Sequence, residues 1–136
     1  MTVPYKPRGW HSVTPRLIVP DAEALVAFLK QAFSAQGDFR PDGPSEILIG
    51  DSIVMVSEAG PRDAMPGFLY LYVDDTDACY ARAVAAGGHS LEAPCDTHYG
   101  DRRASVRDRA GNVWQIATHV EDVPLPEIRR RMVDGH

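Results

Sequence analysis

Hydrophobic and polar positions follow the same order twice along the chain. Each time, a strand-like run comes first, an amphipathic helical run follows, and further strand-like runs separated by turns end the unit. In the first unit Val19-Pro20-Asp21 precedes the helical run, and Gly50-Asp51 precedes the last strand. In the second unit Val73-Asp74-Asp75 and Gly111-Asn112 take these places. The pattern predicts two tandem β-α-β-β-β units.

The first unit occupies about residues 12–58. Its alternation over 12–19 predicts a strand, and Asp21 is a good N-cap for the helix predicted over 22–33, because its carboxylate can accept hydrogen bonds from free backbone N–H groups. The apolar face of this helix consists of Leu25, Phe28, Leu29 and Phe33. Two strands joined at a Gly-Asp turn follow over 46–49 and 52–57.

The second unit occupies about residues 68–119. Phe68–Val73 is rich in strand-forming residues, and Asp75 can cap a helix over 76–86 that ends at Gly87-Gly88. Its other strands are predicted over 90–93, 102–107 and 113–118. The segments outside the units are an N-terminal arm (1–11), a linker (60–67) and a C-terminal tail (120–136) with a helix over 127–132.

Each unit alone is too small to bury an adequate core, so the two are expected to form one domain over residues 1–136. Two such units placed edge to edge give an α+β fold. We predict a curved mixed sheet around a groove, with the helices outside, and the side chains in that groove should decide the function.

Composition excludes several classes of protein. The chain is 44% hydrophobic and 24% charged, as is usual for a globular protein, and its net charge of -5 does not favour nucleic-acid binding. No apolar run approaches the roughly 20 residues of a membrane span, and the N-terminus lacks the apolar part of a signal peptide. We therefore expect a cytoplasmic protein, with Cys79 and Cys95 as structural thiols.

Motifs at the unit boundaries resemble the vicinal oxygen chelate superfamily, which includes glyoxalase I, bleomycin-resistance proteins and extradiol dioxygenases. The resemblance covers about residues 12–122. It rests on Val19-Pro20-Asp21-Ala22 before a helix with Ala27-Phe28, and on Gly111-Asn112-Val113-Trp114-Gln115-Ile116. The stretches Tyr99–Arg102 and Trp114–His119 resemble the PhnB-like branch in particular. The resemblance implies the fold above and a homodimer whose grooves are completed across two chains.

Strand alternation assigns each side chain to the core under the helices or to the groove. The core is predicted to contain Leu17, Val19, Ile53, Met55, Leu69, Leu71, Val73, Trp114 and Ile116. The groove is predicted to contain Thr14, Arg16, Ile18, Glu46, Leu48, Val54, Val56, Glu58, Phe68, Tyr70, Tyr72, Arg103, Ser105, Val113, Gln115 and Ala117.

Metal-using members of the superfamily hold a divalent ion at four strand positions, which the resemblance transfers to Thr14, Val54, Phe68 and Gln115. One neutral amide, a hydroxyl and two hydrocarbons form a poor ligand set, since catalytic divalent ions are held by several His or carboxylate groups. We therefore predict no metal and no cofactor there. A shifted site using His11 or His98 stays an alternative, and His119 is expected to bond locally or to Glu121.

The remaining groove residues suit an organic molecule with a flat part and a charged part, because aromatic rings stack and Arg pairs with carboxylates. The predicted ligand-binding residues are Arg16, Glu46, Glu58, Phe68, Tyr70, Tyr72, Arg103, Ser105 and Gln115. Alternatively, Arg16 and Arg103 pair with Glu58 and Glu46 in a salt-bridge network without a ligand.

Three functions are compatible with this groove. The preferred one is a metal-free small-molecule binding protein of the bleomycin-resistance type, which sequesters an aromatic or charged compound. The alternative is a glyoxalase-like metal-dependent lyase or isomerase with a shifted metal site and with Glu46 or Glu58 as the base, because a carboxylate in a partly apolar groove can have a raised pKa. The third is an interaction module whose groove is filled by its own side chains.

Overall fold

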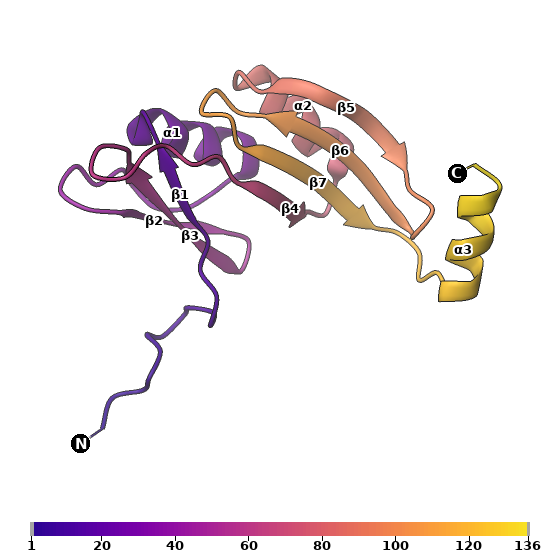
Figure 1. The fold of residues 1–136 in the computed structure, drawn as a ribbon, viewed down its shortest axis with the longest axis horizontal. Coiled ribbons are helices and arrows are strands. Elements are labelled where there is room, and N and C mark those ends of the chain that lie inside the picture. Colours follow the sequence, from indigo (N-terminus) through magenta and orange to yellow (C-terminus); the bar gives the residue numbers. More distant parts are fainter. Residues whose placement is uncertain (1, 136) are drawn as a thin grey trace.

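The computed structural model describes residues 2–135, so the ends of the predicted arm and tail, Met1 and His136, lie outside the described residues. Figure 1 shows two sheets side by side, with α1 and α2 on one side of them and α3 apart at the end of the chain. The elements are β1 (Arg16–Val19), α1 (Ala22–Phe33), β2 (Ser45–Ile49), β3 (Ser52–Glu58), β4 (Phe68–Tyr72), α2 (Thr76–Ala85), β5 (His89–Asp96), β6 (Asp101–Arg107), β7 (Val113–His119) and α3 (Leu125–Val133).

The two sheets have the same strand arrangement. The first has the order β1-β3-β2 and the second β4-β7-β6-β5, and in each the opening strand is parallel to the last strand of its unit. An isolated bridge between Gln36 and Leu48 takes the place in the first sheet that β5 takes in the second. The predicted α+β fold of two βαβββ-like units is therefore confirmed.

Local sequence signals explain where the helices begin. The Asp21 carboxylate accepts a 3.0 Å hydrogen bond from the backbone N–H of Ala24, and the Asp75 carboxylate accepts one of 3.1 Å from Ala78. Each bond satisfies a backbone donor that has no partner within the helix, which stabilises a helix start by about 1 kcal/mol. None of the helices in residues 2–135 is long and apolar enough to cross a membrane.

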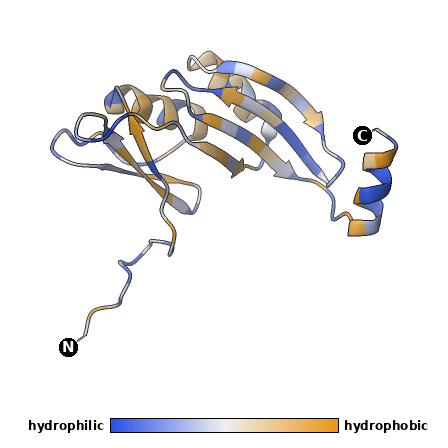
Figure 2. Cartoon of the chain, in the orientation of Figure 1, coloured by the Kyte–Doolittle hydropathy of each residue, from blue (hydrophilic) through white to orange (hydrophobic). Residues whose placement is uncertain are grey.

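One hydrophobic core joins the two units. Phe33 of α1 packs on Trp114 of β7, with ring centroids 5.0 Å apart, and the Cys79 thiol of α2 donates to the carbonyl of Ala32 in α1 at 3.6 Å. The core also includes Leu17, Val19, Leu29, Ile47, Val56, Val106 and Ile116. Figure 2 shows hydrophobic residues in α1 and in the strands, whereas much of α3 is hydrophilic. The units are thus joined by helices and side chains.

Strand hydrogen bonds do not join the units. Within residues 2–135 they form two separate sheets, and the neighbouring edges, β1 and β4, are not paired with each other. On the β1 edge, the linker residue Met65 donates its backbone N–H to the carbonyl of Ile18 at 2.9 Å. The faces of the two sheets opposite α1 and α2 are called the open faces below.

The predicted orientation of β3 is wrong. Val54 and Val56 are buried in the core, so Ile53 and Met55 lie on the open face, and Glu58 points to the helix side. The prediction aligned the two units on their turns, Gly50-Asp51 and Gly111-Asn112, which makes Val54 of the first unit equivalent to Gln115 of the second. Strand pairing gives a different alignment. Arg16 and Tyr70 hold equivalent positions in β1 and β4, and Arg16 pairs with Met55 whereas Tyr70 pairs with Gln115. Met55, and not Val54, is therefore the equivalent of Gln115. The offset is one residue, and one residue reverses every side chain of a strand.

Candidate functional site

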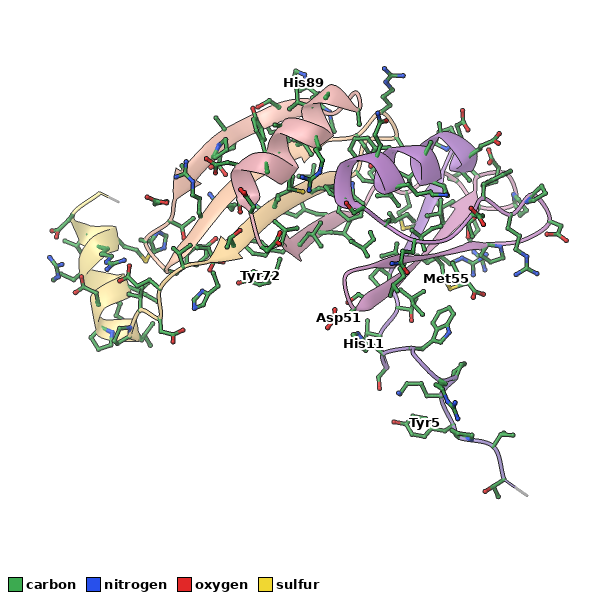
Figure 3. All side chains as sticks on the ribbon, turned by 180° about the vertical axis from the view of Figure 1, so that it is seen from behind. Tyr5, His11, Asp51, Met55, Tyr72 and His89 are labelled. Carbon is green, nitrogen blue, oxygen red and sulfur yellow. The ribbon has the colours of Figure 1, made fainter. Side chains whose placement is uncertain are left out.

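The open face of the second sheet carries most of the predicted ligand-binding residues. Phe68, Tyr70 and Tyr72 project from β4, and they are 70%, 39% and 60% exposed. Their partners on β7 are Val113, Gln115 and Ala117, as the pairing of these strands requires. Arg103 and Ser105 lie on the same face of β6. Figure 3 shows Tyr72 projecting from the side of the sheet opposite α2. The structure thus brings these residues together, and their role in binding stays a prediction.

Asp101 is the centre of the hydrogen bonds on this face. It begins β6, is 1% exposed, and its Oδ2 accepts from the hydroxyls of Tyr70 at 2.7 Å and Tyr72 at 2.8 Å. Its Oδ1 lies 2.8 Å from Nδ1 of His119 at the end of β7. Burial alone would raise the pKa of Asp101, but the bonds from Tyr70, His119 and Tyr72 lower it below its ordinary value. Asp101 is therefore ionised.

The groups bonded to Asp101 have raised pKa values, whereas that of Asp101 is lowered. Burial, together with bonds to Tyr99 and Asp101, raises the pKa of Tyr70, and the bond to Asp101 does the same for Tyr72, so both phenols keep their protons. His119 Nε2 lies 2.7 Å from Asp122, and the bonds to Asp122 and Asp101 raise the pKa of His119. An imidazole between two carboxylates is stabilised in its charged form, in which both ring nitrogens donate.

Arg103 is paired with Glu92 of β5. Its Nε and Nη2 donate to the two carboxylate oxygens at 2.9 and 3.0 Å, and its Nη1 donates to the Tyr99 hydroxyl at 2.9 Å. The Ser105 hydroxyl lies 3.4 Å from the same carboxylate. The alternative in which Arg103 pairs with Glu46 or Glu58 is therefore wrong. Glu92 was not predicted as a site residue because its strand is longer than expected and contains register shifts.

The predicted residues of the first unit do not form a similar cluster. Arg16 donates from Nε to the Ser57 hydroxyl at 2.9 Å, and Glu46 is exposed on the open face of β2. Glu58 accepts at 3.0 Å from the backbone N–H of Ala22, at the start of α1. Glu58 thus caps a helix on the side opposite the open face, which contradicts its prediction as a groove residue and as a candidate base.

The residues at the family's metal positions do not fit a divalent cation. With β3 in its observed orientation the set is Thr14, Met55, Phe68 and Gln115, so a thioether replaces the predicted hydrocarbon of Val54. An amide, a hydroxyl, a thioether and a phenyl ring provide no charged ligand, and thioethers favour soft ions such as Cu(I). Figure 3 shows His11 on the N-terminal arm, which precedes β1. Among residues 2–135 no group of three or more His, Cys, Asp and Glu side chains is placed to hold an ion.

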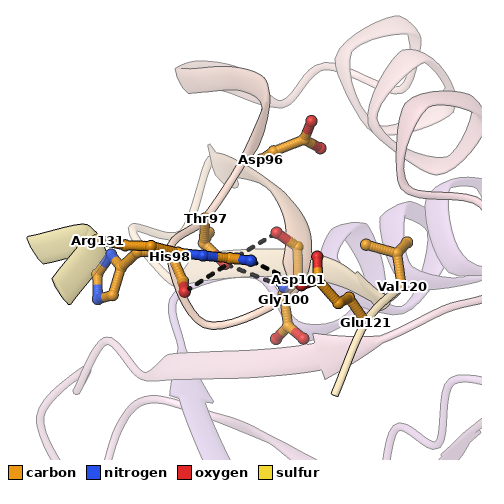
Figure 4. Close-up of a pocket in the computed structure, with 8 residues that line it drawn as sticks. All are labelled: Asp96, Thr97, His98, Gly100, Asp101, Val120, Glu121 and Arg131. Carbon is orange, nitrogen blue, oxygen red and sulfur yellow. Dashed lines mark hydrogen bonds and ion pairs between the residues drawn. The ribbon is translucent and has the colours of Figure 1, made fainter. Parts of the chain in front are cut away.

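A cavity of about 350 Å³ lies beside Asp101, between the β5–β6 loop and α3 (Figure 4). Gly100 adopts φ +95°, and any Cβ there would meet the backbone carbonyl of Glu121. Arg131 of α3 donates to the Glu121 carboxylate at 2.7 Å, and His98 contributes its backbone carbonyl. His98 therefore belongs to the contact between the loop and the C-terminal helix.

Sequence reasoning missed Asp101, Tyr99 and His119 as parts of the site. The signal was available in strand alternation, since Asp101 precedes Arg103 by two positions and His119 follows Gln115 by four. The predicted local bond of His119 is confirmed, since its Nε2 lies beside Asp122, whereas Glu121 is not its partner. The bond of its Nδ1 to Asp101 was not predicted.

Comparison with known proteins agrees with this arrangement. The profile of the Glyoxalase/Bleomycin resistance protein/Dioxygenase superfamily matches residues 11–116. An uncharacterized protein of Mycobacterium bovis is 30% identical, with 89% of this chain and 91% of that protein covered. An uncharacterized protein of Mycobacterium tuberculosis is also 30% identical, with 89% and 82% covered.

Solved structures share the fold at lower identity. TioX from Micromonospora sp. ML1 has a TM-score of 0.69 and 22% identity, over 79% of this chain and 98% of that one. The lactoylglutathione lyase from Agrobacterium tumefaciens has a TM-score of 0.63 and 19% identity, over 79% and 92%. Strand order, paired units and the sequence profile agree, and the chain belongs to the Glyoxalase/Bleomycin resistance protein/Dioxygenase superfamily.

Proposed function

We propose that the protein is a metal-free small-molecule binding protein of the bleomycin-resistance type, and that it sequesters its ligand on the open face of the second sheet. The observation that carries the proposal is the exposure of Phe68, Tyr70 and Tyr72 on one strand, 70%, 39% and 60% respectively. Aromatic rings gathered on one open face are typical of a surface that another molecule covers. Covering them removes apolar area from water, worth roughly 25 cal/mol per Å².

The hydrogen bonds beneath these rings support binding because they hold the site in one conformation. Tyr70 and Tyr72 lie with ring centroids 5.3 Å apart, and both hydroxyls are fixed by the buried Asp101. Side chains that are already ordered lose little entropy when a ligand arrives. Sequestration requires no catalytic group, and this agrees with the loss of Glu58 as a candidate base.

We further propose that the protein acts as a homodimer and belongs to the PhnB-like branch. The inner edges of the sheets, β1 and β4, support the dimer. Within residues 2–135 no named strand pairs with either of them on that side, and a free strand edge offers backbone donors and acceptors to a second chain. In such a dimer the sheets of two chains continue into each other, and each groove is completed across the two chains. Light scattering coupled to size exclusion tests it, and a monomer at micromolar concentration would overturn it.

A thermal-shift and NMR screen against aromatic antibiotics and metabolites tests binding. We expect a ligand to stabilise the protein and to shift the amide resonances of β4, β6 and β7. Phe68→Ala should weaken binding about tenfold or more, whereas Leu125→Ala, which truncates another exposed apolar side chain on α3, should have no effect. Failure of every aromatic compound to bind would refute the proposal.

Metal analysis of protein purified without chelator separates binding from the lyase or isomerase alternative. We expect less than about 0.1 equivalent of Zn, Ni, Mn or Fe, because the ligand set lacks charged groups. A near-stoichiometric ion would overturn the metal-free proposal, and loss of that ion in a His11 or His98 variant would establish the shifted site.

A further inference from the structure

We infer that the site selects ligands that donate hydrogen bonds, above all aromatic compounds with a protonated amine, and that it disfavours carboxylates. The inference rests on the proposed function, since it names the class of ligand for the same open face. It follows from the direction of the hydrogen bonds among Arg103, Tyr99, Tyr70, Tyr72 and Asp101.

The first step fixes the hydroxyl protons. A guanidinium only donates and an ionised carboxylate only accepts, so both ends of the chain of bonds are determined. Tyr70 uses its single proton on Asp101, and Tyr99, which lies 2.9 Å from the Tyr70 hydroxyl, must therefore donate to it. The Tyr99 oxygen in turn accepts from Arg103, and Tyr72 gives its proton to Asp101. Every hydroxyl proton of the cluster is thus engaged within the protein.

The second step concerns what remains for a ligand. A phenol hydroxyl donates its proton and accepts on its oxygen. The oxygens of Tyr70 and Tyr99 already accept within the cluster, from Tyr99 and from Arg103 respectively, whereas the Tyr72 oxygen accepts no bond of the cluster. Tyr72, which is 60% exposed, therefore presents an acceptor to the open face. A ligand that donates can bond to it, and one that only accepts cannot.

The charges of the cluster also favour an ammonium over a carboxylate. The cluster contains the carboxylates of Asp101, Glu92 and Asp122 against the cations of Arg103 and His119, three negative groups against two positive. Arg103 is engaged on two nitrogens by Glu92, so its charge is already paired. Within this cluster a ligand carboxylate would meet no unpaired cation, whereas an ammonium would meet excess negative charge and aromatic faces that attract cations.

Three probes with the same ring and chain test the selectivity, namely phenethylammonium, trimethyl(phenethyl)ammonium and 3-phenylpropanoate. Titrations followed by ¹H–¹⁵N spectra measure affinities into the millimolar range. We expect phenethylammonium to bind about tenfold more tightly than the carboxylate, with the trimethyl compound between them because it keeps the charge but has no N–H donor. Equal affinities, or tighter binding of the carboxylate, would overturn the inference while leaving the proposed function intact. Absence of binding by all three would overturn the inference, and the proposed function fails as well only if every aromatic compound of the wider screen also fails to bind.

Asp101→Asn tests the cause. An amide placed toward Tyr70 and Tyr72 donates to their oxygens, so their protons turn to the open face and one negative charge is lost. The ratio of ammonium to carboxylate affinity should fall about tenfold. Tyr72→Phe removes one acceptor and keeps the ring, so it should lower the ratio even if the Asn variant fails to fold.

Tyr80→Phe is the matched control. The Tyr80 hydroxyl lies 2.7 Å from the Ser90 hydroxyl, and Tyr80 belongs to α2, so the change removes a comparable bond outside the site. The ratio of ammonium to carboxylate affinity in this variant should equal that of the unmodified protein. A ratio unchanged in the Tyr72 variant, or equally changed in the Tyr80 variant, would refute the assigned cause.

Discussion

Asp108 organises the turn between β6 and β7, and replacing it should destabilise the protein strongly. Its carboxylate is buried and accepts from the backbone N–H groups of Ala110 and Asn112, both at 3.0 Å. It also accepts at 2.9 Å from the side-chain amide of Asn112 and at 2.9 Å from the indole N–H of Trp114. The Asn112 amide oxygen then accepts from the backbone of Gly67 at 2.8 Å, which joins the linker to the turn.

Asp108→Ala leaves these donors without an acceptor. Asn112 and Trp114 are 0% and 1% exposed, so water cannot readily replace the carboxylate. A buried donor that loses its partner costs about 1–3 kcal/mol, and the two side-chain donors together give roughly 3–5 kcal/mol after partial relaxation. At about 4 °C per kcal/mol for a chain of this size, the melting temperature should fall by about 12–20 °C.

Thermal unfolding by circular dichroism measures the effect, with Asp63→Ala in the exposed linker as the control that should change stability by less than about 0.5 kcal/mol. Asp108→Asn keeps one acceptor oxygen and should fall between the two. A loss below about 4 °C in the alanine variant would show that the network contributes little, and the reasoning from buried donors would be wrong.

Further expectations concern other contacts. The pKa of His119 is raised above 6.5, so its ion pairs stabilise the protein fully at lower pH and lose their effect as pH rises through the folded-state pKa. Urea titrations should therefore show the stability deficit of His119→Gln shrinking as pH rises above 6.5. Gly100→Ala should lower stability by about 3 kcal/mol, since a Cβ meets the Glu121 carbonyl, whereas Gly111→Ala at the same φ of +95° has room and should cost about 1 kcal/mol. Phe33→Ala should cost about 3–5 kcal/mol and keep unfolding a single transition by fluorescence and circular dichroism, because the units share a core.

Helices and most strands could be predicted because their signals are local. Asp21 and Asp75 cap helices whose apolar spacing is visible in the sequence, and the faces of β4 and β7 follow from simple alternation. The orientation of β3 could not be predicted from the turns, since it depends on which residue of β1 it pairs with. The bond between Tyr70 and Asp101 spans 31 residues and depends on the register of three strands, and local pattern does not set that register.

Because β1 and β4 are not paired with each other in the described residues, their edges affect how the protein behaves at high concentration. When two chains pair so that the β1 and β4 edges of both are covered, no edge stays free and no third chain can add. A chain that pairs through only one edge keeps another free, and repeated pairing of that kind produces linear polymers. The backbone contact of Met65 on the β1 edge shields part of it, whereas β4 offers an aromatic strand. Substitutions that prevent closure should therefore lead to fibres.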